Sequence, residues 1–221
     1  MVRDSGDDLE ALRGSPLLTM SELAARGYSR MKVKRLHETG RLEKVAYGIY
    51  RLPEAEDDSR LLWAAVSAKH PYAVFCLESA AAFHGITQNM APRLNIAIPA
   101  GYRPFSLESA GVAVDFVKLK GGMLDFGIVE TEIAGVKVKI TDAARTVSDM
   151  FRFSSLNRYQ KRDSIRIDVE TFHDALSRYL EREGVSEGAS KIRKVTDKRL
   201  WNELGPHVQM MARSMERSPA V

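Results

Sequence analysis

Residues 20–52 read MSELAARGYSRMKVKRLHETGRLEKVAYGIYRL, and this stretch decides the fold of the N-terminal part. Its pattern predicts a helix over about 21–26, a turn at Gly27, and a second helix that Ser29 caps and Gly40 ends. Glycine suits both ends because it takes a left-handed backbone conformation without a Cβ penalty. A serine suits the N-cap because its hydroxyl accepts a free backbone N–H of the first helical turn.

A short hairpin is predicted directly after the second helix. Its strands lie near 42–44 and 49–52, and the turn lies at 46–48. Helix, tight turn, helix and hairpin, in that order and that close together, predict a winged helix-turn-helix domain over residues 1–53. Lys44 and Tyr47, near the tip of the hairpin, are predicted to contact the DNA backbone or the minor groove.

The second helix of this motif has a thin apolar seam and a cationic outer face. Val33 and Leu36 are three residues apart and point inward. Between residues 26 and 44 there are seven Arg or Lys and only two acids. Such a face suits the DNA major groove, where phosphates supply affinity and base edges supply specificity. The residues predicted to reach the bases are Arg30, Met31, Lys34 and Arg35, and Arg30 and Lys32 lie on the flanks of this face. The alternative to DNA binding is a small helical domain whose basic face is simply exposed to solvent.

Composition narrows the class of protein. The 221 residues carry a net charge of +4 and a sequence pI near 9.2, which is too mildly basic for a histone-like binder. The one cysteine, Cys76, cannot form an internal disulfide, and we expect a cytoplasmic, reducing location. No apolar stretch approaches the roughly 20 residues of a membrane span, and the N-terminus lacks the apolar core of a signal peptide. We therefore expect no membrane association.

An acidic linker over residues 54–58 is predicted to lead into a mixed α/β domain over 59–221. The complete fold is then α+β, a winged helix-turn-helix followed by this α/β domain with a helical C-terminal section. Alternating or apolar runs predict strands near 72–77, 93–99, 112–116, 126–133 and 136–140. Helical periodicity predicts helices near 58–69, 78–84, 141–152, 168–183, 187–194, 198–204 and 206–215.

Motifs for catalysis or cofactor binding are weak. The sequence contains neither GxxxxGK[ST] nor GxGxxG, and the five histidines have no partner at metal-ligand spacing. We therefore expect no cofactor, no metal and no catalysis. A metal-dependent nuclease is the enzymatic alternative, with Asp115, Glu130 and Glu132 as candidate carboxylates. It is disfavoured because no lysine follows Glu130 or Glu132 at a spacing of two residues.

Two basic clusters lie in the second half of the chain. The first contains Arg158, Lys161, Arg162 and Arg166, and the second contains Lys191, Arg193, Lys194, Lys198 and Arg199. Each could contact phosphates, RNA or a protein partner, or could form a solvated face.

Four segments give the chain a family resemblance over nearly its full length. They are GYSRMKVKRLHETGRLEKVAYGIYRLP at 27–53, LESAAAFHGI at 77–86, VKITDAARTVSDMFRF at 138–153 and DVETFHDALSRYLEREG at 168–184. In these segments the chain resembles the AbiEi-family antitoxins, the regulators of bacterial type IV toxin–antitoxin and abortive-infection pairs. The last 30 residues match only loosely.

The resemblance implies a repressor that binds inverted repeats in double-stranded DNA at its own promoter. It also implies a second domain that neutralises a cognate nucleotidyltransferase-like toxin without a stable complex. The matched DNA-binding positions are Ser29, Arg30, Lys34, Arg35 and the wing at 44–50.

Residues Arg145, Thr146 and Asp149 match a recurrent family pattern, and with Arg158, Lys161 and Arg162 they are candidates for antitoxin function. Because Arg145 and Asp149 are four residues apart on a predicted helix, we expect a surface ion pair worth a few tenths of a kcal/mol.

Three hypotheses follow from the sequence. The first is a non-catalytic repressor and antitoxin, and the second is a nuclease targeted by the winged domain. The third is a winged-helix transcription factor without a toxin partner.

Overall fold

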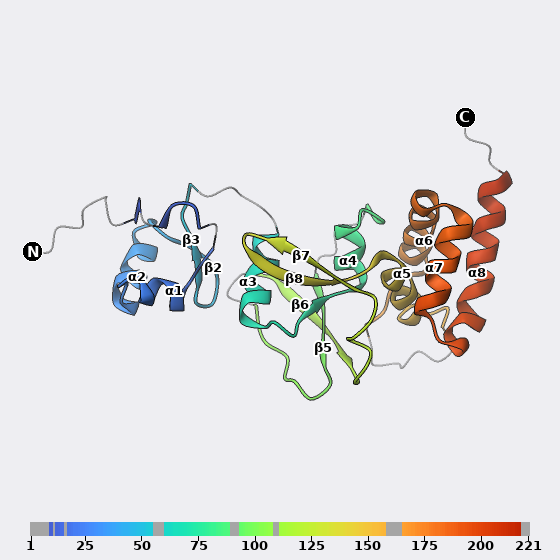
Figure 1. Cartoon of the computed structure of the whole chain (residues 1–221), viewed down its shortest axis with the longest axis horizontal. Helices are drawn as coiled ribbons and strands as arrows, with labels where there is room; N and C mark the ends of the chain where they lie inside the picture. The colour runs from blue at the N-terminus through green and yellow to red at the C-terminus, as the bar shows by residue number, and fades with distance from the viewer. Residues whose placement is uncertain are drawn as a thin grey trace, which may run out of the picture. The chain divides into compact units, whose positions relative to one another are not determined.

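The chain combines helices and strands in two compact units. The computed structural model describes residues 9–10, 12–15, 17–54, 60–88, 93–107, 111–157 and 165–217. One unit comprises 1–72, 105–112 and 130–138, and the other comprises 73–104, 113–129 and 139–221. The mixture of helices with two sheets confirms the predicted α+β class (Figure 1).

The N-terminal unit begins with a small sheet and two helices. Its elements are β1 (Leu18–Thr19), α1 (Met20–Ala25), α2 (Arg30–Glu38), β2 (Glu43–Ala46) and β3 (Ile49–Arg51). The strands are antiparallel in the order β1-β3-β2, and Tyr50 pairs with Leu18 on one side and with Lys44 on the other. The sequence did not predict β1, but the two helices followed by the β2–β3 wing confirm the winged helix-turn-helix (Figure 1).

An apolar cluster holds the winged part of this unit together. Val33 and Leu36 are buried, as the helical period predicts, and they pack with Leu12, Leu23 and Leu42. The cluster fixes which face of α2 points inward, so the opposite face must point to solvent.

The first helix starts one residue earlier than its apolar pattern predicts. Thr19 is its N-cap, because the Glu22 N–H donates to Thr19 Oγ1 at 3.2 Å and the Thr19 N–H donates to Glu22 Oε2 at 2.7 Å. This is a capping box, and its T-x-x-E signature is present in the sequence.

Helix α3 (Leu61–Lys69) belongs to the same unit as the winged helix-turn-helix. It follows the predicted linker, of which residues 55–58 lie outside the described residues. Helix α3 packs against β2, the first strand of the wing.

The other unit contains most of a five-stranded mixed sheet, in the order β6-β5-β4-β8-β7. The strands are β4 (Val74–Phe75), β5 (Arg93–Pro99), β6 (Ala113–Leu119), β7 (Ile128–Ile133) and β8 (Val136–Thr141). Strand β4 runs antiparallel to β5 and parallel to β8, whereas β5 and β6 are parallel. The predicted β7–β8 hairpin turns at Ala134 and Gly135, whose φ angles are 53° and 76°.

Five helices accompany this sheet. They are α4 (Leu77–Phe83), α5 (Ala143–Arg152), α6 (Val169–Glu183), α7 (Val185–Val195) and α8 (Lys198–Arg217). Helix α5 packs against α4, α6, α7 and α8, so it is the central helix of this unit (Figure 1).

The last helix, α8, differs from the sequence prediction. Two helices, 198–204 and 206–215, were predicted because of Gly205 and Pro206, but α8 is continuous through Pro206. A proline inside a helix removes one backbone hydrogen bond and usually kinks or breaks it. Here Leu200, Leu204 and Val208 form a buried stripe at helical spacing that passes Pro206, and its packing maintains the helix.

Candidate nucleic-acid interface

The turn before α2 determines how this helix is presented. Gly27 has a φ of 84°, which a residue with a Cβ rarely adopts. Tyr28 is then buried, and the Lys32 N–H donates to Ser29 Oγ at 3.2 Å. The predicted N-cap is therefore present, and α2 begins at Arg30.

The four predicted base-contacting residues lie on the outer face of α2 or on its flank. Arg30, Met31, Lys34 and Arg35 are exposed, and Met31 has a relative exposure of 74%. Lys34 Nζ lies 3.7 Å from Glu38 Oε1, but both side chains are well exposed, so this ion pair is weak. The face thus combines cations, which suit phosphates and guanine edges, with an apolar thioether that suits a thymine methyl group.

Ser29 and Lys32 already have roles within the fold. The Ser29 hydroxyl oxygen accepts the capping bond, and Lys32 Nζ lies 4.6 Å from the centroid of the Tyr28 ring. Both residues border the outward face of α2, and their contacts with DNA stay predictions.

The wing presents an aromatic ring that two lysines approach. Tyr47 is 72% exposed at the turn, and Gly48 follows it with a φ of 76°. Lys44 Nζ lies 5.6 Å from the centroid of the Tyr47 ring, and Lys69 Nζ of α3 lies 4.7 Å from it. Sequence reasoning missed Lys69, because no local pattern indicates that the end of α3 reaches the wing.

The base of the wing is fixed by a separate ion pair. Arg51 Nε donates to Glu43 Oε2 at 2.7 Å across the β2–β3 pair, and the Arg51 side chain is largely buried. This pair neutralises one acid near the interface and maintains the register of the hairpin.

The predicted ion pair between Arg145 and Asp149 is present, but its predicted position on the helix surface is wrong, because both residues are buried. Arg145 is 1% exposed and Asp149 is 8% exposed. Arg145 Nε donates to Asp149 Oδ2 at 3.1 Å, and Nη1 donates to the Phe126 carbonyl oxygen. The guanidinium carbon lies 4.7 Å from the centroid of the Phe126 ring. These contacts hold the loop before β7 against α5.

Thr146 also lies in the interior, at the start of α5. Thr146 Oγ1 donates to the Asp142 carbonyl oxygen at 2.7 Å, and Asp142 Oδ1 accepts the Arg145 N–H at 2.8 Å. Thr141 Oγ1 lies 2.8 Å from Thr146 Oγ1. The TDAART segment therefore builds a helix N-terminus, and in this structure Arg145, Thr146 and Asp149 are not available as a contact surface.

The described residues include Arg166 of the first basic cluster and all of the second. Arg158, Lys161 and Arg162 lie outside the described residues, whereas Arg166 is exposed. In the second cluster, Lys191 Nζ lies 2.7 Å from Glu183 Oε2 and 2.8 Å from Glu187 Oε1. These carboxylates offset the charge of Lys191, so the cluster is less cationic than its sequence indicates.

The candidate nuclease carboxylates are not assembled into a metal site. Asp115 lies on β6, one outer strand of the sheet, and its Oδ1 is 2.8 Å from Nη2 of Arg93 on β5. Glu130 and Glu132 lie on β7, the other outer strand. Among the described residues, no group of three or more His, Cys, Asp or Glu side chains is arranged to hold a metal ion.

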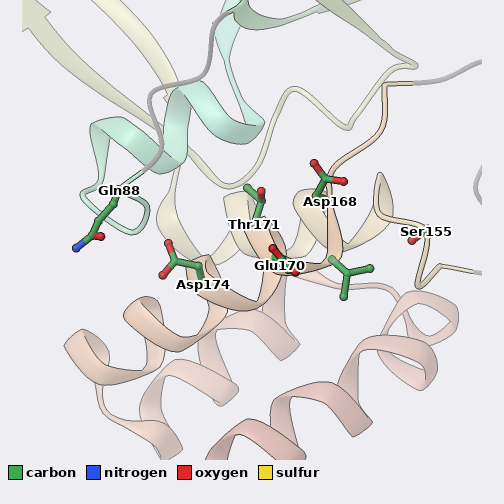
Figure 2. Close-up of a pocket in the computed structure, with 7 residues that line it drawn as sticks. Gln88, Ser155, Asp168, Glu170, Thr171 and Asp174 are labelled. Carbon is green, nitrogen blue, oxygen red and sulfur yellow. The ribbon is translucent and has the colours of Figure 1, made fainter.

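A separate hollow of about 770 Å³ lies beside the start of α6. Its lining includes the acids Asp168, Glu170 and Asp174 together with Gln88 and Ser155 (Figure 2). Because nucleic-acid backbones are anionic, this acidic lining disfavours the hollow as part of a nucleic-acid interface.

None of the helices in the described ranges combines the length and the apolar character that crossing a bilayer requires.

Comparisons with known proteins agree with this geometry. The structure is similar to the crystal structure of the RV2827C protein from Mycobacterium tuberculosis, with a TM-score of 0.60 and 13% sequence identity. The match covers 94% of this chain and 75% of that one, and at this identity it concerns the fold alone. A search of curated proteins finds no match. Residues 8–53 match the family model described as a transcriptional regulator, AbiEi antitoxin. The winged helix-turn-helix of this chain is therefore similar to that of the AbiEi antitoxin family of transcriptional regulators.

Proposed function

We propose that this protein is a DNA-binding repressor of its own operon and the antitoxin of a type IV toxin–antitoxin pair. In this proposal α2 enters the major groove of inverted repeats at the promoter, and the β2–β3 wing contacts the adjacent backbone. The protein acts in the cytoplasm without catalysis, cofactor or metal.

One observation carries the DNA-binding part. The residues predicted to contact the bases are all exposed: Met31, Lys34 and Arg35 lie on the face of α2 opposite its buried seam, and Arg30 lies on the flank of that face at the start of the helix. A helix packed through Val33 and Leu36 presents this face as a rigid surface, so little conformational freedom is lost on binding.

The antitoxin part rests on the family match of residues 8–53. The partner that this family implies is a nucleotidyltransferase-like toxin, neutralised without a stable complex. The family is typically non-enzymatic, which supports a regulatory role over the nuclease alternative.

The first experiment is a gel-shift titration on the DNA upstream of the protein's own gene, at several salt concentrations. It compares the wild type with an Arg30→Ala/Lys34→Ala/Arg35→Ala variant. We expect specific binding that weakens steeply with salt and collapses in the variant, because the variant loses both base and phosphate contacts.

The matched control is a Lys191→Ala/Arg193→Ala/Lys194→Ala variant, which removes the same number of positive charges from α7. It should bind operator DNA like the wild type. If it loses binding and the α2 variant does not, the interface lies on the C-terminal helices. If the wild type does not prefer its upstream DNA over random sequence, autoregulation is ruled out.

The antitoxin proposal needs a separate experiment. An adjacent gene for a nucleotidyltransferase-like protein should inhibit growth when expressed alone and should not do so when this protein is co-expressed. If the neighbouring gene is harmless in every combination, a winged-helix transcription factor without a toxin partner is the better description. Mg²⁺-dependent DNA cleavage that is lost in an Asp115→Ala variant would establish the nuclease instead.

A further inference from the structure

We propose that Lys69 of α3 is part of the DNA-binding surface and, with Lys44, forms a phosphate clamp around Tyr47 at the tip of the wing. This inference rests on the proposed DNA binding and extends it beyond the residues of the winged motif itself. The family match ends at residue 53, so it does not cover α3.

The argument begins with the position of the two ammonium groups. Lys44 Nζ and Lys69 Nζ lie 5.6 and 4.7 Å from the centroid of the same Tyr47 ring. They come from different elements, β2 and α3, which pack against each other in one compact unit. Two positive charges are therefore held together on one small patch.

The patch is accessible to a ligand. Lys69 is exposed at the last turn of α3, Lys44 is half-buried on β2, and Tyr47 is 72% exposed at the turn of the wing. An exposed cation–π contact is weak, so it orients an ammonium group without preventing a phosphate contact. The tyrosine ring limits how far each lysine side chain spreads, and less side-chain freedom is then lost on binding.

The position of the two lysines suits a contact with the DNA backbone. The wing of this motif lies beside the helix that reads the major groove, and lysine recognises phosphate as a point charge and not through base edges. The clamp should therefore add affinity that does not depend on sequence, whereas the outer face of α2 supplies the sequence preference.

The test measures the salt dependence of DNA binding for Lys69→Ala, Lys44→Ala and the double variant. Each lost phosphate contact lowers the slope of log K against log salt by about 0.9. Extrapolated from 1 M salt, one such contact corresponds to about eight-fold in affinity at 0.1 M. We expect this loss for each single variant and a slope change of about 1.8 for the double variant. The loss should be equal on operator and random duplexes.

Two control variants make the result specific. Lys118→Ala removes the same charge from an exposed position on β6 and should leave the slope unchanged. Lys69→Arg retains the charge and should retain most of the affinity. Melting curves show whether Lys69→Ala remains folded.

The outcomes separate this inference from the function on which it depends. If the α2 variant loses operator binding but Lys69→Ala keeps the wild-type slope, the clamp is wrong and the DNA-binding proposal stands. If Lys118→Ala lowers the slope as much as Lys69→Ala, net charge explains the effect and the clamp is again wrong. If the α2 variant binds like the wild type, the proposed function itself fails.

Discussion

Gly127 is the position where a single methyl group should disturb the buried arginine. Its φ is +60°, and a Cβ added there would lie 2.7 Å from Arg145 Cδ, 3.1 Å from Arg145 Cβ and 3.2 Å from Asp142 Oδ2. The arginine cannot simply move away, because Asp149 and the Phe126 carbonyl oxygen hold its guanidinium. Gly127→Ala should therefore both strain the backbone and displace Arg145.

The expected loss of stability in Gly127→Ala has two parts. A residue with a Cβ in the left-handed region costs about 1–2 kcal/mol, and overpacking of a tight interior costs about 1–3 kcal/mol. Gly122→Ala isolates the first part, since Gly122 has a φ of +69° and nothing lies within 4 Å of its added Cβ. Gly127→Ala should then be less stable than Gly122→Ala by about 1–3 kcal/mol, from the overpacking alone.

The assay is urea denaturation of the three proteins followed by circular dichroism. For a chain of this size, thermal melts should also show Gly127→Ala about 2–12 °C below Gly122→Ala. The reasoning is refuted if the two alanine variants are equally stable. An Arg145→Ala exchange in the Gly127→Ala background removes the side-chain clash, so the two exchanges together should cost less than the sum of their separate effects.

Three further predictions concern Asp149, Ser29 and His207. Asp149→Ala leaves Arg145 buried without its counter-ion and should cost about 3–5 kcal/mol in urea denaturation, whereas a milder loss would mean that water reaches the guanidinium. Ser29→Ala removes the N-cap of α2 and should cost about 0.5–2 kcal/mol. An unchanged melting curve would show that the cap does not stabilise this helix. Burial, and next the charge of the nearby His173, lower the pKa of His207 from its ordinary value of 6.5. The unfolded chain then takes up the proton more readily, so the stability from neutral His207 is present above pH 6.5 and lost as pH falls below it. Stability measured from pH 7.5 to 5.5 should fall less steeply in His207→Phe.

The winged motif was predictable because its determinants are local. Val33 and Leu36 at a spacing of three residues define the inner face of α2, and Gly27 with Ser29 defines its start. Once these are known, the outward position of Met31 and Lys34 follows from the helical period alone. The third strand of this sheet was missed because β1 has only two residues, too few to show a period.

The contribution of α3 was not predictable from the sequence. Lys69 reaches Tyr47 only because α3 packs against β2, and that packing depends on contacts between segments far apart in the chain. A terminal lysine on a helix is also the ordinary complement to the helix dipole, so the residue by itself indicates nothing further.

No signal in the sequence of α5 indicates that Arg145 is buried. Charged residues four positions apart normally indicate an exposed helix face. Ala144, Val147 and Met150 share one side of α5, so the helical period predicts that Arg145 and Asp149 face solvent. Both are buried because α5 packs against α4, α6, α7 and α8, and this packing depends on contacts that no local pattern indicates.

This burial changes how mutations in the family pattern should be interpreted. If Asp149→Ala abolishes antitoxin activity, the fold predicts that it does so by lowering the amount of folded protein. Activity should then recover at a lower growth temperature and should follow the fraction of folded protein across a series of α5 variants. Loss of activity in a variant that is as stable as the wild type would contradict this interpretation. It would mean that Arg145 and Asp149 become exposed in a state that this structure does not represent, and α5 itself would then be the place to seek the antitoxin mechanism.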